Sequence, residues 1–277
     1  MSSFYDSRVL ARVKAHGEAN ADPYRNAFPF PHIVIEDFLP PKVIEPVLAA
    51  FPNPRAGVEW IEFNNEEERK LAFPRAEKMP GILRDVLYFL NAQPMLEFLE
   101  KLTGIQNLIP DPYFIGGGLH QIEPGGKLGV HVDFNKYERF DLDRRLNLLL
   151  YMNKDWQESY GGHLELWDRT MTRCESRVLP LFNRCVVFST TESSFHGHPV
   201  PLTCPEGRTR KSIATYYYTN GRPEAEQGNS HSTVFRRRPG EEADRIELAR
   251  KVIRSFVPPV VTDAVRFLKR RIGPNGA

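Results

Sequence analysis

The residues with the clearest capacity for chemistry are His131 and Asp133, in the run Gly129-Val-His131-Val-Asp133. Side chains two positions apart on an extended strand point to the same face, so this pair can present a nitrogen and a carboxylate oxygen to one metal ion. With a second histidine, the set would leave three positions of an octahedral ion open, as non-haem iron(II) oxygenases require. Alone, the pair is weak support, because a His-x-Asp tripeptide also arises by chance at solvated strand ends.

Two histidines further along the chain are candidates for the missing ligand, His196 and His198 in His196-Gly-His198-Pro. They share the same parity on an extended chain, so alternation does not choose between them. A further polar pair, Arg210 and Ser212, opens an apolar run and lies on one strand face. A guanidinium fork beside a hydroxyl is a good site for a carboxylate.

Short strands must position these groups. Separated by Gly, Pro and Asn turns, the expected strands cover residues 113–122, 128–132, 145–152, 163–168, 177–182, 184–189 and 211–219. Several short strands at this spacing favour an antiparallel sandwich or barrel. No helical pattern alternates with them, which argues against a parallel α/β sheet. The segment 134–145, directly after the metal motif, is a candidate lid with substrate contacts or else an exposed loop.

Helical patterns flank the strands, so the fold class is mainly β with flanking helices. Before the strands, a strand at 32–35 precedes helices expected at 43–51, 66–72, 81–90 and 95–102, the last closed by Gly104. Two more helical patterns follow residue 239. The sequence therefore predicts an N-terminal segment at 1–110, a catalytic core at 111–221 and a basic C-terminal helical extension at 222–277.

Charge and cysteine usage narrow the class of protein. The net charge is only +2, which does not favour nucleic acid as a partner, although residues 236–277 carry eleven Lys/Arg against five Asp/Glu. That extension is expected to pack on the barrel or form a homodimer contact, with an anionic membrane surface as the third option. Three cysteines without a C-x-x-C pair, no signal-peptide pattern and no membrane-length apolar run predict a cytoplasmic protein.

The ordered motifs resemble the prolyl-4-hydroxylase-like iron(II)- and 2-oxoglutarate-dependent dioxygenases. Beyond His-x-Asp, the distal histidine and Arg-x-Ser, the similar segments are Arg145-Leu-Asn-Leu-Leu-Leu-Tyr-Met-Asn-Lys-Asp-Trp156, Gly161-Gly162, Asn183-Arg-Cys-Val-Val-Phe188 and Arg210-Lys-Ser-Ile-Ala-Thr-Tyr-Tyr-Tyr218. The resemblance covers about residues 25–220 and is strongest from Gly117 to Tyr218. It implies a double-stranded β-helix, a jelly roll of the cupin-like kind, with the metal near one open end.

The same resemblance assigns roles. It implies Fe(II) as the metal, with His131, Asp133 and His196 as ligands, and takes His196 rather than His198 because the family's histidine directly precedes the Gly-x-Pro turn. No catalytic residue is expected beyond these ligands. The expected co-substrates are 2-oxoglutarate and O2, with ascorbate as a candidate additional cofactor.

For the co-substrate, the resemblance implies that Arg210 holds the distal carboxylate of 2-oxoglutarate, with Ser212 assisting. Tyr151 matches a family tyrosine that hydrogen-bonds the same carboxylate. Asn147 shares strand parity with Tyr151 and is expected to face the same cavity.

The expected activity is hydroxylation of an unactivated C–H bond in a small molecule or biosynthetic intermediate, with release of succinate and CO2. A protein or peptide hydroxylase of the prolyl type is the first alternative. A jelly-roll binding module without catalysis is the second. Desaturation and epimerisation use the same motifs, so the sequence leaves them open, together with the identity of the substrate.

Overall fold

The computed structural model of the protein describes residues 3–55 and 57–241. The chain divides into one compact unit of residues 1–238 and a second of residues 239–277. The basic C-terminal helices, and the dimer contact expected from them, lie outside the described residues. None of the described helices is long and apolar enough to cross a membrane.

The first unit combines helices near its N-terminus with antiparallel strands. The α-helices are α1 (Ser7–Arg25), α2 (Pro41–Ala49), α3 (Gly81–Leu90) and α4 (Gln93–Thr103). The strands are β1 (His32–Ile35), β2 (Ile61–Asn64), β3 (Arg69–Phe73), β4 (Ile109–Pro110), β5 (Gly118–Ile122), β6 (Leu128–Val132), β7 (Lys136–Tyr137), β8 (Leu142–Tyr151), β9 (Leu164–Trp167), β10 (Cys174–Val178), β11 (Cys185–Ser189), β12 (His196–His198), β13 (Arg210–Thr219) and β14 (Val234–Phe235).

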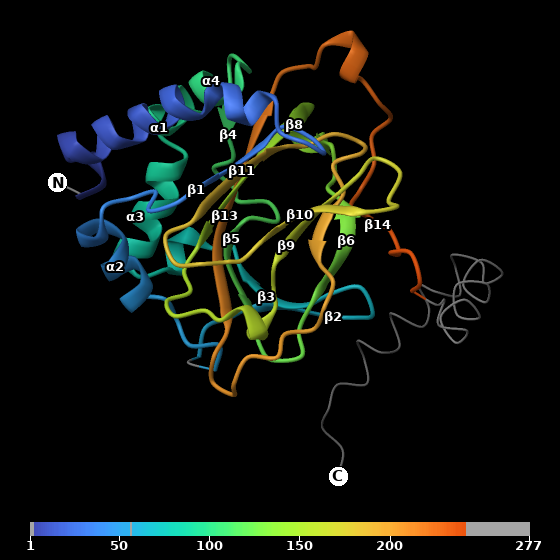
Figure 1. Cartoon of the computed structure of the whole chain (residues 1–277). Helices are drawn as coiled ribbons and strands as arrows, with labels where there is room; N and C mark the ends of the chain where they lie inside the picture. Colours follow the sequence, from blue (N-terminus) through green and yellow to red (C-terminus); the bar gives the residue numbers. More distant parts are fainter. Residues whose placement is uncertain (1–2, 56, 242–277) are drawn as a thin grey trace, which may run out of the picture. The chain divides into compact units, whose positions relative to one another are not determined.

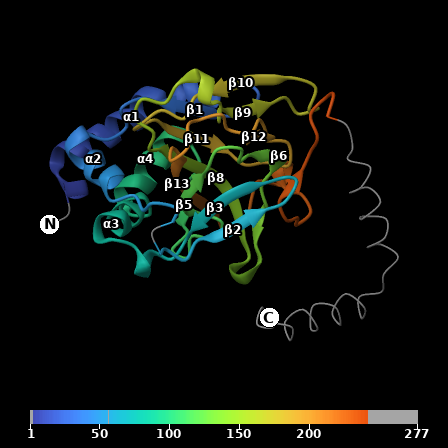
Figure 2. The same cartoon turned by 90° about the horizontal axis from the view of Figure 1, so that it is seen from below.

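The strands form two sheets that face each other, with the helices on the far side of the larger one (Figure 1, Figure 2). The larger sheet has the order β1-β11-β8-β13-β5-β3-β2, with β4 beside β13 and β7 beside β8. The smaller sheet has the order β10-β9-β12-β6-β14. Every pairing is antiparallel, so the fold is the predicted double-stranded β-helix with flanking helices.

Alternation along β8 shows how one strand serves two layers. Leu146, Leu148 and Leu150 join the core shared with the helices. Asn147 and Leu149, which lie between them, and Tyr151, which follows them, face the opposite side, toward the smaller sheet. Because successive side chains on a strand point to opposite faces, the apolar positions fix which polar residues reach the interior of the barrel.

Most expected elements are found, but the strands expected at 113–122 and 177–182 are observed only at Gly118–Ile122 and Cys174–Val178, and one expected helix is absent. The expected helix at 66–72 is wrong, because β2 and β3 form a hairpin there and β3 pairs with β5. Asn65 explains the turn, since its side-chain oxygen accepts hydrogen bonds from the amides of Glu67 and Glu68 at 2.9 Å each. Such an Asx turn competes with a helix for the backbone donors.

The helices expected at 43–51, 81–90 and 95–102 are present as α2, α3 and α4. Gly104 ends α4 in the left-handed conformation, as predicted. Strands β1 to β4 precede residue 111, yet β1 and β3 pair directly with the core strands β11 and β5. The expected N-terminal segment thus contributes strands to the large sheet as well as helices.

Candidate metal and co-substrate site

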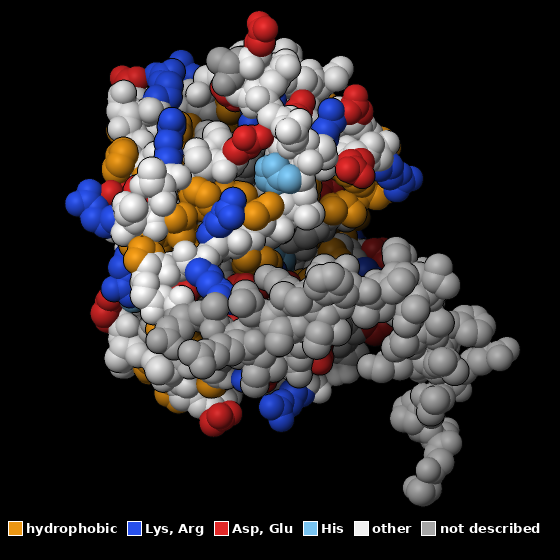
Figure 3. Space-filling view, turned by 90° about the vertical axis from the view of Figure 1, so that its right-hand side faces the viewer, with side chains coloured by type: hydrophobic (Ala, Val, Ile, Leu, Met, Phe, Trp, Pro, Cys, Tyr) orange, Lys and Arg blue, Asp and Glu red, His pale blue; other side chains and the backbone are white. Residues whose placement is uncertain are grey.

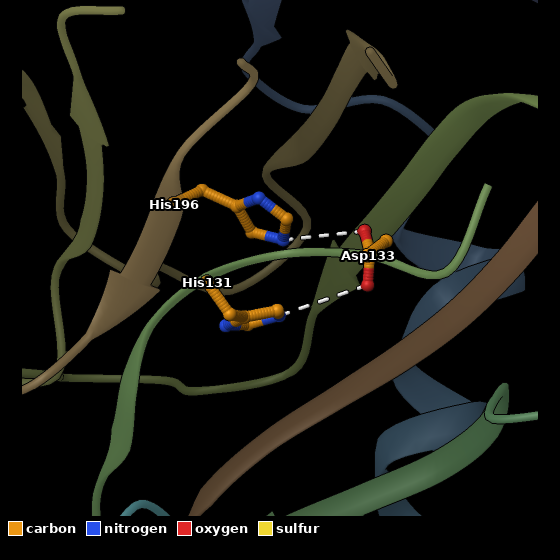
Figure 4. Close-up of side chains that lie close together, drawn as sticks. All are labelled: His131, Asp133 and His196. Atoms are coloured by element: carbon orange, nitrogen blue, oxygen red, sulfur yellow. Dashed lines mark ion pairs between the residues drawn. The ribbon is translucent and has the colours of Figure 1, made fainter. Parts of the chain in front are cut away.

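Three potential metal ligands converge at the smaller sheet (Figure 4). His131 lies near the end of β6, Asp133 follows that strand directly, and His196 begins β12. The two histidines are cross-strand partners. The Nε2 atoms of His131 and His196 lie 3.6 and 3.4 Å from the two carboxylate oxygens of Asp133, and the three ligand atoms all lie within 4.8 Å of one another.

Hydrogen bonds fix which ring nitrogen faces the centre. Nδ1 of His131 lies 2.8 Å from the carbonyl of Gly129, and Nδ1 of His196 lies 2.9 Å from the carbonyl of Ser194. A carbonyl can only accept, so each Nδ1 carries the hydrogen and each Nε2 offers its lone pair. Burial, and then the neighbouring His131, lower the pKa of His196 to about 4, which keeps this ring neutral as a ligand must be.

The structure separates the two candidate distal histidines. His196 pairs with His131, whereas His198 pairs with Leu128, with a register shift between them. Gly197 makes this packing possible, because a Cβ there would lie 2.7 Å from the carbonyl oxygen of Gly129. His196 joins the cluster of potential ligands and His198 does not.

Asp133 is held by a buried arginine and an amide. Nη2 of Arg144 lies 3.1 Å from Oδ2 of Asp133, and Nδ2 of Asn147 donates to the same oxygen at 2.7 Å. Arg144 in turn donates to the side-chain oxygen of Asn147 through Nε at 3.0 Å and Nη2 at 2.7 Å. Its guanidinium, only 1% exposed, lies 3.5 Å from the ring centre of Tyr216. This network orients the carboxylate from behind.

Charge balance keeps Asp133 ionised. Burial alone would raise the pKa of its carboxyl, but the neighbouring Arg144 holds that pKa well below its ordinary value. Two imidazoles and one carboxylate on one face match the donor set that binds Fe(II) with open positions. His131, Asp133 and His196 are therefore the residues that would hold such an ion.

These groups line one cavity of about 280 Å³ between the two sheets. Its wall carries the three potential ligands together with Arg144, Asn147, Arg210, Ser212, His120 and His198. Phe63, Lys70 and Ile115 are the lining residues from β2, β3 and the loop before β5. The side of the molecule toward which β6 and β14 lie shows hydrophobic side chains interspersed with Lys and Arg (Figure 3).

Arg210 is seated rigidly at the start of β13. Its Nε donates to the carbonyl of Gly162 at 2.7 Å and its Nη2 to the hydroxyl of Tyr151 at 3.2 Å. Gly162 has a positive φ of 74°, and a Cβ there would lie 2.9 Å from Cδ of Arg210, so only glycine leaves room. A buried guanidinium with its remaining donors directed at a cavity is suited to a carboxylate ligand.

Register places the expected co-substrate residues in two rows on the inner face of the larger sheet. Tyr151, Ser212 and His120 lie opposite one another on β8, β13 and β5. Asn147 and Tyr216 form a second inner pair, beyond Leu149 and Ala214, toward the metal ligands. Tyr151 reaches the cavity through Arg210, whereas Asn147 is bonded to Asp133 and Arg144, so its hydrogen bonds support the metal end.

Sequence reasoning missed Arg144. It lies in the segment expected to be a lid or an exposed loop, yet β8 begins at Leu142 and buries it. The signal was available in the two adjacent arginines that open a long apolar strand, because a buried arginine requires an anionic partner.

The short strand β14 was also missed. It pairs with β6, and Phe235 lies opposite His131 with ring centres 5.4 Å apart. A two-residue strand in a polar stretch has no periodicity from which to predict it.

The comparisons agree with this geometry. The sequence model described as the 2OG-Fe(II) oxygenase superfamily matches residues 117–218. Among curated protein sequences no match was found. A prolyl-4-hydroxylase structure from Pseudomonas putida has 20% identity and a TM-score of 0.54, covering 74% of this chain and all of its own.

Two further solved structures share the fold. A prolyl hydroxylase from Trichoplax adhaerens, in complex with a hypoxia inducible factor peptide fragment, has 15% identity and a TM-score of 0.56, covering 78% of this chain and 94% of its own. A prolyl 4-hydroxylase from Phytophthora capsici has 17% identity and a TM-score of 0.52, covering 83% and 73%. Residues 117–218 thus form a domain of the 2OG-Fe(II) oxygenase superfamily, which indicates a 2-oxoglutarate-dependent dioxygenase.

Proposed function

We propose that the protein hydroxylates an unactivated C–H bond of a small molecule or biosynthetic intermediate, with release of succinate and CO2. The observation that carries the proposal is the placement of His131, Asp133, His196 and Arg210 in the wall of one cavity of about 280 Å³. A metal end and a carboxylate-binding end in the same cavity allow 2-oxoglutarate to bridge them.

The residues of the site have separate roles. Fe(II) held by the three ligands supplies, with 2-oxoglutarate and O2, the oxidising power for hydroxylation. Arg144 and Asn147 keep the Asp133 carboxylate ionised and oriented. Arg210 orients the co-substrate through its far carboxylate. The rings of Tyr216 and Phe235 line the cavity and limit access of water to the reacting atoms.

The size of the cavity favours a small substrate. Its volume lies near the lower end of the range for ligand pockets. Once 2-oxoglutarate occupies the Arg210 end, the space left suits a compact molecule or a single side chain. Hydroxylation of a peptide is the second candidate, because the similar Trichoplax adhaerens structure carries a peptide fragment.

Anaerobic titration of the Fe(II)-loaded protein with 2-oxoglutarate tests the first step, since a charge-transfer band is expected on chelation. Succinate formation is then measured against two panels, one of small biosynthetic intermediates and one of proline-containing peptides. Mass spectrometry follows the product, and a gain of one oxygen distinguishes hydroxylation from desaturation or epimerisation. His131→Ala protein serves as the blank.

Succinate coupled to an oxygenated small molecule is the expected result. Coupling to a peptide only would replace the first candidate with the second. Absence of both the band and succinate in protein with full iron content would contradict the proposal.

A further inference from the structure

His198 lies in the cavity wall but belongs neither to the potential ligands nor to the hydrogen-bond network around Asp133. Its side chain is buried, with a residue exposure of 3%, and neither ring nitrogen has a hydrogen-bond partner among the described residues. Burying an imidazole removes water from both nitrogens, so native proteins normally provide partners for them. An unpartnered ring that lines a cavity therefore indicates a ligand.

Position along β12 indicates which part of the ligand it meets. His196 and His198 are two residues apart, which is roughly 6.6 Å along an extended strand. His196 marks the metal end of the cavity, so His198 lies further from that end by about the length of a short dicarboxylate. Arg210 and Ser212 also line the cavity, from the opposing sheet.

Geometry suits His198 as a donor beside Arg210. An imidazole carries an N–H donor in either tautomer, and both side chains line the same cavity from opposing sheets. A carboxylate between the two groups would accept hydrogen bonds from both.

We propose that His198 is a positioning residue that donates a hydrogen bond to the distal carboxylate of 2-oxoglutarate, opposite Arg210. This rests on the proposed function, because it assigns a further residue to that co-substrate site. The carboxylate would be held from both sheets, by Arg210 on β13 and by His198 on β12. His198 then helps to select a dicarboxylic 2-oxo acid over a monocarboxylic one.

The test compares two probes on the full-length, Fe(II)-loaded protein under anaerobic conditions. One probe is 2-oxoglutarate, and the other is 2-oxovalerate, which keeps the chelating end and the chain length but lacks the distal carboxylate. Dissociation constants are measured for wild type, His198→Leu and His198→Gln. Iron content and the midpoint of thermal unfolding confirm that each variant is folded and loaded.

His198→Leu is expected to weaken binding of 2-oxoglutarate about tenfold, the usual effect of losing a hydrogen bond to a charged group, and to leave 2-oxovalerate within about twofold. His198→Gln, which keeps an N–H donor, is expected to recover most of the loss. His16→Gln is the matched control, because His16 on α1 also leaves Nε2 without a partner among the described residues but lies outside the cavity.

Unchanged binding of 2-oxoglutarate by His198→Leu would overturn the inference. Equal losses for both probes would also overturn it, because they would place His198 at the chelating end or in the shape of the cavity. If the wild type itself shows no saturable binding of 2-oxoglutarate, the proposed function fails first, and the two failures are thus distinguishable.

Discussion

The two ends of the cavity differ in how their polar groups are satisfied. At the metal end, Asp133, Arg144 and Asn147 bond to one another. At the other end, Arg210 is anchored through Gly162 and Tyr151. Nε2 of His120 and both ring nitrogens of His198, however, have no hydrogen-bond partner among the described residues. The polar groups of the metal end satisfy one another, whereas the co-substrate end presents nitrogens suited to binding a carboxylate.

The largest effect is expected from breaking the metal end. His131→Ala or Asp133→Ala removes one of three ligands, so iron binding and succinate formation should fall below detection. Metal content after dialysis and succinate yield measure the two losses. His131→Ala is expected to stay folded, whereas Asp133→Ala leaves the buried Arg144 without its anionic partner, so the midpoint of thermal unfolding is measured for both variants. 2-Oxoglutarate decarboxylation that persists in both variants would contradict this ligand set.

Breaking the co-substrate end should leave the metal in place. Arg210→Gln removes a charge-assisted contact, so the dissociation constant for 2-oxoglutarate should rise about thirtyfold while iron affinity is unchanged. Arg208→Gln is the control, because that guanidinium bonds to the backbone of Lys154 and does not line the cavity. Equal losses in the two variants would indicate a general effect of charge rather than a carboxylate site.

Weakening the hydrogen-bond network behind Asp133 should have the opposite effect, with weaker iron binding and nearly unchanged 2-oxoglutarate binding. Arg144→Leu removes the cation that holds the carboxylate, so iron affinity should fall roughly tenfold, as for other residues that orient metal ligands, with little change for 2-oxoglutarate. Arg145→Leu is a close control, because Arg145 is also buried but bonds to Thr219 and Glu226. Metal titration with a competing chelator measures both. Equal iron affinity in the two variants would show that Arg144 does not support Asp133 as a metal ligand.

Acid should lower the free energy of unfolding through the neutral imidazole of His120 at the co-substrate end. Burial, and next the charge of Lys70, lower the pKa of His120 to about 3, against about 6.5 in an unfolded chain. Between these values only the unfolded chain binds the proton, so this contribution to stability is complete above pH 6.5 and is lost as pH falls toward 3.

Urea unfolding of the metal-free protein at two pH values checks the acid effect. Between about pH 7 and pH 5.5, wild type should lose about 1 kcal/mol more free energy of unfolding than His120→Gln. The same loss in both proteins would show that His120 does not titrate in this way.

Many residues at the two ends of the cavity could be predicted from the order of motifs in the sequence. His131-x-Asp133 on a strand, a histidine on a later strand and Arg210-x-Ser212 are local patterns, and antiparallel pairing brings them to one cavity. Gly161-Gly162 was recognised only as part of a resemblance. The structure supplies its physical reason, which is the room that Gly162 leaves for Arg210.

What escaped prediction depends on contacts between distant segments. From the sequence, Arg144 is expected at the surface, and only its tertiary contact with Asp133 shows why it is buried. Helix α1 was not predicted, because most of its buried positions are small. They are Val9, Val13, Gly17, Ala21 and Tyr24, and α4 packs against this helix. The β2–β3 hairpin carries charges typical of a helix, and only pairing with β5 makes it a strand.

The cross-strand pairing of His131 with His196 has a consequence for the stability of the barrel itself. The two residues are far apart in sequence, and strands β7 to β11 lie between them. An ion bound to both would act as a removable cross-link, closing that long loop much as a disulfide does in a secreted protein. Loading the metal should therefore slow hydrogen exchange most at β6 and β12, so that iron supply governs how long the folded barrel survives as well as whether it reacts.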